Sequence, residues 1–225
     1  MAKANRIQNR QNKPIKTGFH RKKKTGRGNF VVQDEFAIQA QKAGYRARSI
    51  YKLLEIQERF ELIKPDYVVL DVGCAPGSFL QGIRNIVKQN TIVGIDLKPC
   101  KPFSHKNIHT IVGDIFDYNN VSQAVTQIIG SDQFDIITSD IAPNTTGRKD
   151  VDQYASVELN IEIVQFSDRF LKKGGNLLLK VFQGEDFNDL TQQIKKRFTD
   201  MKVYKPRACR DSSHEVYVIC FEKKA

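Results

Sequence analysis

The sequence contains no tryptophan, only two methionines, and four each of histidine and cysteine. No two cysteines form a CxxC pair, which argues against a zinc ribbon or a disulfide scaffold and is typical of a reducing compartment. We therefore expect the protein in the cytoplasm, with nucleolar and organellar locations left open. The few histidines offer no metal-ligand set, so we also expect no metal site.

Long apolar runs are missing as well. No run approaches the roughly 20 residues that a helix needs to span a bilayer, and no charged start is followed by an apolar segment. We therefore expect neither a membrane protein nor a secretory signal. Hydrophobic residues make up 40% of the 225 residues, which is ordinary for a globular chain and allows a sizeable core.

Acidic residues are absent from the first part of the chain. Residues 1–33 hold ten Lys or Arg and no Asp or Glu, whereas residues 34–225 hold 26 basic and 25 acidic side chains. The formal net charge of +11 therefore comes almost entirely from the first segment. Because this segment is poor in large apolar residues, we expect a disordered basic arm that attracts nucleic-acid phosphates. A solubility tail or a targeting signal is the simpler alternative.

In the rest of the chain, apolar strand-like runs alternate with amphipathic helical patterns. Runs that are apolar on both faces and separated by helices indicate a mostly parallel sheet covered on both sides. The expected strands are 67–72, 91–96, 109–112, 134–139, 176–181 and 215–221, and helical spacing occurs in 79–86, 121–128, 154–164 and 187–198. Residues 34–60 are predicted as a helical preface, broken near Gly44, to one doubly wound domain that covers 34–225.

In such a fold, ligands bind beyond the carboxyl ends of the strands. The first strand runs into a turn that has glycine at 73 and 77 but Ala75 where a dinucleotide fingerprint would have a second glycine. Asp96 ends the second strand and Asp114 follows the third, so the set suits a nucleoside without a pyrophosphate. A glycine turn alone is common, but the turn with both acids indicates S-adenosylmethionine. A nicotinamide-dependent oxidoreductase is the disfavoured alternative.

Charged residues end two of the central strands. Lys180 closes an apolar run, where an unpaired ammonium is costly, and we expect it in the ligand cleft rather than extended to solvent. Asp140 closes another strand, where a turn cap is about equally compatible with the local pattern. Glu215 resembles an ordinary strand-edge charge, and Lys52 resembles the helical partner of Glu55.

Five separated motifs carry a resemblance to a known family. They are YRARSIYKL (45–53), LDVGCAPGS (70–78), SDIAPN (139–144), GGN with KVFQG (174–184), and KP followed by EVY (205–217). In this order, over about 34–225, the sequence resembles the FtsJ/RrmJ family of S-adenosylmethionine-dependent RNA ribose 2′-O-methyltransferases. The basic arm lies outside the resemblance.

The resemblance implies an α/β fold: a single Rossmann-like class I methyltransferase domain, with a mostly parallel sheet, an antiparallel last strand and helices on both faces. It implies a catalytic tetrad of Lys52, Asp140, Lys180 and Glu215. It also implies S-adenosylmethionine contacts at Gly73, Gly77, Phe79, Asp96, Asp114 and Asp140. Phe79 stands where the family usually has Trp, so a contact there would be apolar or through the backbone.

The resemblance also implies the reaction and its substrate. Lys180 would contact the ribose 2′-hydroxyl as a base or as an orienting group. Residues 142–144 and 180–184 look more like the large-subunit rRNA enzymes than the tRNA anticodon-loop enzymes. We therefore expect a monomer that methylates a uridine in the A-loop of 23S-type rRNA, within a precursor subunit and coupled to ribosome assembly.

Two alternatives stay open, a tRNA anticodon-loop methyltransferase and, from another class, a non-catalytic RNA-binding ribosome-assembly factor. In either case we expect basic residues that flank the motifs to meet RNA phosphates, and a solvated basic face is their simpler interpretation. These residues are Arg46, Arg48, Lys205, Arg207 and Arg210.

Overall fold

The computed structural model describes residues 35–210 and 213–225. The arm predicted for residues 1–33 lies outside the described residues. The strands are β1 (Val69–Val72), β2 (Ile92–Asp96), β3 (Ile108–Val112), β4 (Phe134–Ser139), β5 (Leu171–Phe182), β6 (Phe198–Tyr204) and β7 (Glu215–Lys223). The helices are α1 (Glu35–Lys42), α2 (Ile50–Phe60), α3 (Ser78–Ile86), α4 (Tyr118–Ile129), α5 (Lys149–Phe170) and α6 (Phe187–Arg197).

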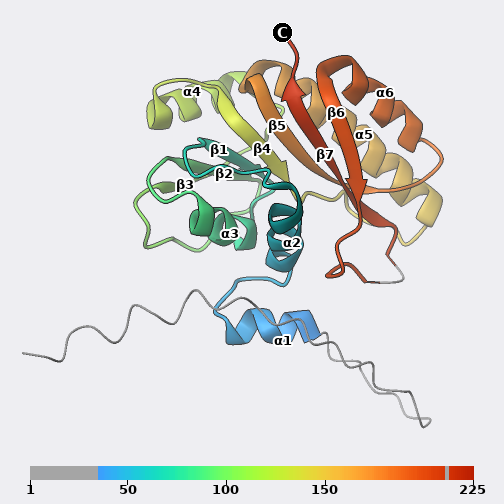
Figure 1. The fold of residues 1–225 in the computed structure, drawn as a ribbon, viewed down its shortest axis with the longest axis horizontal. Coiled ribbons are helices and arrows are strands. Elements are labelled where there is room, and N and C mark those ends of the chain that lie inside the picture. The colour runs from blue at the N-terminus through green and yellow to red at the C-terminus, as the bar shows by residue number, and fades with distance from the viewer. Residues whose placement is uncertain (1–34, 211–212) are drawn as a thin grey trace, which may run out of the picture. The chain divides into compact units, whose positions relative to one another are not determined.

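The seven strands form a sheet in the order β3-β2-β1-β4-β5-β7-β6 (Figure 1). Strands β1 to β5 pair in parallel, and β7 is antiparallel to both of its neighbours, β5 and β6. This arrangement confirms the predicted mostly parallel sheet with an antiparallel last strand. The strand order reverses between β1 and β4, and in doubly wound folds ligands bind at such a switch point, beyond the carboxyl ends of the strands. In Figure 1 these ends lie at the lower side of the sheet, beside α2.

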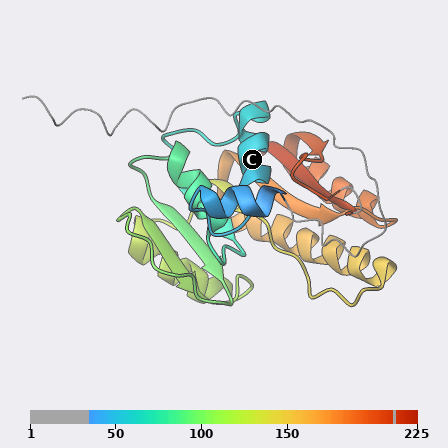
Figure 2. The same ribbon diagram turned by 90° about the horizontal axis from the view of Figure 1, so that it is seen from below.

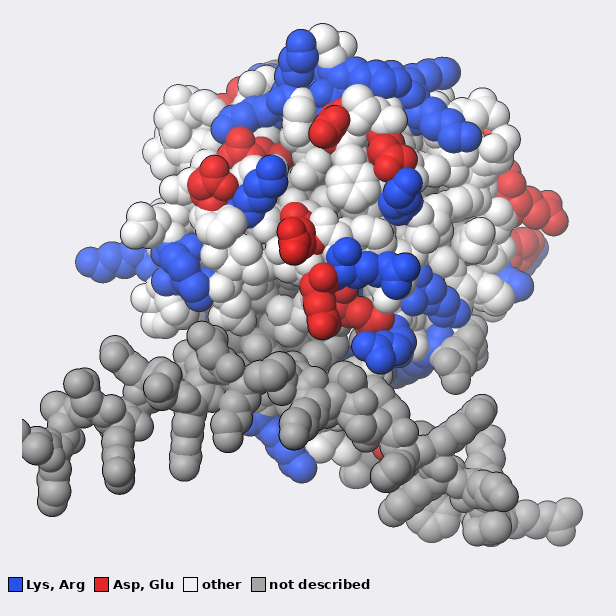
Figure 3. Space-filling model, viewed as in Figure 1, with Lys and Arg blue, Asp and Glu red and all other residues white. Residues whose placement is uncertain are grey.

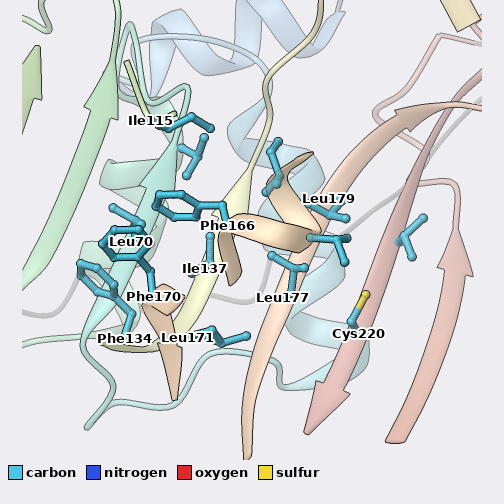
Figure 4. Packing of buried hydrophobic residues seen from close by; sticks show 14 of the residues in the cluster. Leu70, Ile115, Phe134, Ile137, Phe166, Phe170, Leu171, Leu177, Leu179 and Cys220 are labelled. Atoms are coloured by element: carbon cyan, nitrogen blue, oxygen red, sulfur yellow. The ribbon is translucent and has the colours of Figure 1, made fainter. Parts of the chain in front are cut away.

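Helices cover both faces of the sheet, so the central strands have a buried side chain at almost every position. Helices α2 and α3 lie on one face, and α4 and α5 lie on the other (Figure 2). Along β5 the alternation is direct, since Leu178 packs in the core with α2 and α3 while Leu177 and Leu179 pack in the core with α5. Figure 4 shows this second core, in which Phe166 stacks on Phe170 with ring centroids 4.2 Å apart.

One strand was not predicted, and another is longer than predicted. Residues 198–204 form the edge strand β6, whereas the sequence pattern placed Phe198 in the preceding helix. An edge strand has a neighbour on one side only, and four of the seven residues of β6 are exposed, three of them polar, so it lacks the apolar run that marks a central strand. Strand β5 begins at Leu171 rather than 176, because polar residues and two glycines interrupt its apolar pattern.

Helix α2 positions part of the functional site. It buries Ile50, Leu53 and Ile56, which recur every three residues and form one apolar stripe against the sheet. Lys52 is also buried, although it is charged. The expected break near Gly44 falls in the connection between α1 and α2. Within the part of the chain that the structure describes, no helix is long and apolar enough to cross a bilayer.

Candidate active site

Four charged side chains, from α2, the residue after β4, β5 and β7, form two ion pairs. Nζ of Lys180 lies 3.2 Å from Oδ1 of Asp140 and also donates to the main-chain carbonyl of Asp140. Nζ of Lys52 lies 2.5 Å from Oε1 of Glu215. Only 10–19% of each side chain is exposed. Both pairs are therefore largely withdrawn from water. In the less polar interior of a protein, the attraction between opposite charges is stronger than in water.

The register of β5 and β7 explains why these residues face the same way. Lys180 pairs with Tyr217, and Phe182 pairs with Glu215, in the antiparallel ladder. Because residues two apart in a strand project from the same face, Lys180, Tyr217 and Glu215 share one face of the sheet. That face is covered by α2, which supplies Lys52.

Tyr217 connects the two ion pairs. Its hydroxyl donates to Oδ1 of Asp140 over 2.5 Å, and Nζ of Lys52 lies 5.9 Å from the centroid of its ring. Burial, and then the charge of Asp140, raise the pKa of Tyr217 well above its usual value, so the phenol is a donor at neutral pH. From the sequence, Tyr217 stands out only as part of the EVY motif. Its position two residues after Glu215 in an apolar strand is the signal that would have assigned it to this cluster.

Glu215 has a second partner on the chain segment before β7. Sγ of Cys209 lies 3.3 Å from Oε1 of Glu215, and burial raises the pKa of this thiol to about 12, so it is a neutral donor. The guanidinium of Arg48 donates to the carbonyl of Ala208. These contacts hold residues 205–210 beside Glu215. Arg48, expected to meet phosphates, thus makes at least one contact within the protein.

The turn after β1 lies at the switch point of the sheet. Gly73 has a φ of +70°, and a Cβ there would lie 2.9 Å from Cβ of Ile141, so the turn approaches the segment after β4 too closely for a side chain. The carboxylate of Asp96 accepts the N–H of Ala75 at Oδ2 and the N–H of Lys98 at Oδ1. The turn and the end of β2 are therefore joined through a residue predicted to bind the cofactor.

The remaining predicted cofactor residues lie in different environments. Phe79 is 2% exposed and packs in the core between α2 and the sheet, which leaves only its main chain for a ligand. Asp114 is exposed, and its Oδ1 accepts the N–H of Phe116. Gly77 has a φ of +106°, and Phe103 and Arg46 fill the space beside its Cα.

A buried acidic side chain, Asp71, lies near the end of β1. Oδ2 of Asp71 is buried without a hydrogen-bond partner, while Thr138 donates to Oδ1 over 2.7 Å. Burial, and then repulsion from Asp140 and Asp96, raise the pKa of Asp71 to about 8. Asp71 therefore holds its proton at neutral pH, and a cationic group bound near these acids would favour their charged forms.

Apolar side chains complete the nucleoside side of the site. Leu97 directly follows Asp96 and is 71% exposed, and Val112, paired with Asp96 across the ladder, is 61% exposed. Phe116 follows Asp114 and is also exposed. An apolar surface next to the two acids fits a purine base, so these residues suit S-adenosylmethionine. Among the described residues, no group of three or more His, Cys, Asp or Glu could hold a metal ion.

A family model described as FtsJ-like methyltransferase matches residues 45–223, which include all four members of the charged cluster. This chain belongs to the FtsJ-like methyltransferase family. It is 41% identical over 199 residues to the ribosomal RNA large subunit methyltransferase E of Desulfatibacillum aliphaticivorans, which covers 88% of this chain and 94% of that protein. It is 43% identical over 187 residues to the protein of the same name from Methanococcus maripaludis, which covers 83% of this chain and 72% of that one.

Solved structures agree with this membership. A crystal structure from Plasmodium falciparum, described as a ribosomal RNA methyltransferase, is 32% identical, with a TM-score of 0.71 over 80% of this chain and 98% of that one. Human methyltransferase-like protein 13 in complex with SAH is 14% identical, with a TM-score of 0.57 over 76% of this chain and 81% of that one, and supports the fold alone. This FtsJ-like protein is therefore a methyltransferase, and its cofactor is S-adenosylmethionine.

Proposed function

We propose that this FtsJ-like enzyme methylates a ribose 2′-hydroxyl of large-subunit rRNA, and that the acceptor is a uridine of the A-loop within a precursor subunit, so that methylation accompanies ribosome assembly. The observation that carries the proposal is the convergence of Lys180 and Tyr217 on Asp140, next to the turn that suits the cofactor. The names of the curated relatives support rRNA as the substrate class.

When bound, S-adenosylmethionine supplies an electrophilic methyl group and departs as a neutral thioether, so the leaving group needs no proton. The protein must therefore align and activate a weak nucleophile, the ribose hydroxyl. Alignment supplies up to roughly 7–11 kcal/mol and a positioned base about 10²–10⁴-fold in rate. Alignment therefore contributes more to the rate than the base does. A buried cluster whose side chains are held in place by one another can provide this alignment.

Lys180 is the residue that we assign to the 2′-oxygen. Its Nζ donates to the main-chain carbonyl of Asp140 and forms an ion pair with the carboxylate of the same residue. These two contacts hold the ammonium in place, and since an ammonium has three donors, it keeps one that serves to fix the acceptor oxygen. Lys52 and Glu215, the second ion pair, are assigned to the remainder of the acceptor ribose.

RNA would cross the turn formed by residues 205–210. The main-chain N–H of Arg207 donates to both carboxylate oxygens of Glu55 in α2, at 3.0 and 3.2 Å, and the hydroxyl of Tyr204 donates to Oε1 over 2.6 Å. Three basic residues of this turn are exposed: Lys205, Arg207 and Arg210. Figure 3 shows basic side chains gathered near the lower ends of β6 and β7, with acidic ones among them. This preformed basic turn beside Glu215 suits a phosphate backbone.

The test is methyl transfer from labelled S-adenosylmethionine to precursor large subunits, to naked A-loop RNA and to tRNA. We expect precursor subunits to be labelled at one A-loop uridine, with the adjoining phosphodiester resistant to alkali because its 2′-oxygen is blocked. Labelling of a base, or of tRNA alone, would contradict the proposal.

The Lys180→Met variant tests the assigned role. It keeps the length of the side chain without its donors, and we expect methyl transfer to fall at least about 10³-fold, because the alignment of the acceptor oxygen is lost. Lys172→Met is the matched control, since Lys172 lies on the same strand and pairs with Asp135 over 2.7 Å at its other end. Near-normal turnover by Lys180→Met, with cofactor binding intact, would remove Lys180 from the mechanism.

A further inference from the structure

Arg46, which lies between α1 and α2, contacts two separate segments of the chain with its guanidinium. Its guanidinium lies over the ring of Phe103, with Cζ 3.6 Å from the ring centroid. Its Nη1 donates to the carbonyl of Pro76 over 3.0 Å, and its Nη2 donates to the carbonyl of Pro102 over 2.8 Å. One side chain thus joins the cofactor turn after β1 to the segment of residues 97–103 that follows β2.

The glycine at position 77 is what permits this packing. A Cβ at Gly77 would lie 2.7 Å from Cζ of Phe103 and 2.8 Å from Nη1 of Arg46. Both distances are shorter than real Cβ contacts, and the φ of +106° also favours glycine. Gly77, which the resemblance assigns to cofactor contact, therefore also makes room for Arg46 and Phe103.

The main chain of Arg46 is fixed as well. Its N–H donates to Oε1 of Gln81 in α3 over 2.8 Å, and Nε2 of Gln81 donates to the carbonyl of Gly44 over 3.1 Å. Arg46 lies four residues before α2, the helix that carries Lys52. The segment that leads into α2, which carries Lys52, is thereby bonded to α3, the helix that follows the cofactor turn.

The segment that Arg46 holds borders the nucleoside side of the site. Residues 97–103 begin directly after Asp96, and the N–H of Lys98 donates to Oδ1 of Asp96. A second contact joins the same segment to the turn, since Sγ of Cys100 lies 3.5 Å from Sγ of Cys74. A change that freed this segment from the turn would therefore loosen the surroundings of Asp96.

We propose that Arg46 is a positioning residue of the cofactor site: stacked on Phe103 and bonded to Pro76 and Pro102, it holds residues 97–103 closed against the cofactor turn. Arg46 was expected from the sequence to meet RNA phosphates. In the structure, two of its nitrogens and the face of its guanidinium are engaged within the protein, at the cofactor turn. The connection from Arg46 to the part of the site that would hold the acceptor ribose rests on the proposed function of Lys52.

The proposal is tested by the affinity of the purified full-length protein for S-adenosylmethionine and S-adenosylhomocysteine, measured by calorimetry without RNA. We expect Arg46→Met to weaken both affinities about tenfold, because the two hydrogen bonds and the stacking contact that order the segment are lost. Arg46→Lys, which keeps a charged donor but not the planar stack, should lose less. Phe103→Leu removes the stacking surface and should weaken both affinities in the same direction.

Arg59→Met is the matched control. Arg59 also stacks on an aromatic ring, with Cζ 4.9 Å from the centroid of Tyr204, but it lies near the end of α2 away from the cofactor turn. It should leave cofactor affinity unchanged. The double variant Arg46→Met/Phe103→Leu should lose little more than Arg46→Met alone, because both changes remove one shared contact, whereas independent destabilisation would add.

Two results would overturn the proposal. One is an unchanged cofactor affinity in Arg46→Met; weakened RNA binding by the same variant, measured separately, would then make Arg46 a phosphate contact. The other is an equal loss of cofactor affinity in Arg59→Met. Because cofactor binding is measured without RNA, a failure of the A-loop assignment would leave this experiment's outcome untouched.

Discussion

Lys180 of β5 and Tyr217 of β7 lie opposite each other in the antiparallel ladder, and both contact one oxygen, Oδ1 of Asp140: the lysine forms an ion pair with it over 3.2 Å, and the tyrosine hydroxyl donates to it over 2.5 Å. The tyrosine is fully buried, and the lysine is nearly so. A carboxylate that accepts two fixed donors is itself fixed, so Tyr217 determines where Asp140 can hold Lys180. We regard Tyr217 as a positioning residue for that lysine.

Tyr217→Phe tests this assignment. The variant keeps the ring that fills the core and removes one donor to a charged acceptor, a contact worth about 1.5–3 kcal/mol. We expect kcat to fall about tenfold, with little change in the KM for cofactor or RNA, since neither ligand is assigned to the phenol. Steady-state kinetics provide the check.

Tyr118→Phe serves as the control for the loss of a phenol. Tyr118 packs edge-on against Phe166, in the core on the other face of the sheet. The assignment fails if Tyr217→Phe and Tyr118→Phe have equal kcat values, or if Tyr217→Phe raises the KM for cofactor instead.

The fold and the site could be predicted to different extents. Strand β4 was predicted with both of its ends, because it is buried at all but one position and Phe134, Ile136 and Ile137 give it a strong apolar pattern. Strand β6 could not be, since an exposed edge strand has no such run. The site depends on long-range pairing: 163 residues separate Lys52 from Glu215, so no local pattern reveals their contact, and only the family motifs did.

The raised pKa of Asp71 should make the stability of the protein depend on pH. Its pKa is raised from 3.8 to about 8 in the fold, mainly by burial. The folded chain thus holds a proton between about pH 4 and pH 8 that the unfolded chain has released. The free energy of unfolding should therefore fall as pH rises through this window, by up to about 1.4 kcal/mol per unit, and level off above it.

Asp71→Asn isolates this contribution. The amide cannot ionise and still accepts the hydroxyl of Thr138, so we expect the variant without cofactor to gain stability over the wild type as pH rises from 5 to 8. Urea denaturation at several pH values measures the difference. Parallel curves for the two proteins would show that Asp71 is ionised in the fold at pH 5, contrary to its raised pKa.

A change at Glu55 should weaken RNA binding without affecting cofactor binding. Its carboxylate anchors the main chain of Arg207 and the hydroxyl of Tyr204, so Glu55→Ala should release the basic turn of residues 205–210 from α2. We expect the KM for RNA to rise about fivefold, because binding must then order the turn, while the cofactor affinity stays constant. Glu58→Ala, at an exposed position of the same helix, is the control. A fall in cofactor affinity with an unchanged KM for RNA would refute this role.

The charge of the basic arm leads us to expect that it strengthens RNA binding. Residues 1–30 carry ten Lys or Arg and no acid, while residues 34–225 are nearly neutral. Each phosphate that the arm neutralises releases counterions, so deletion of residues 1–30 should weaken RNA binding most at low salt. It should also reduce the slope of log affinity against log salt by about 0.7–0.9 per lost contact. Cofactor affinity should not change.

A variant with the ten basic residues replaced by Gln, at the same length, separates charge from chain length. It should behave like the deletion if the arm acts through phosphate neutralisation. An unchanged salt slope in both variants would mean that the arm does not contact RNA. A loss in the deletion but not in the Gln variant would assign its effect to something other than charge.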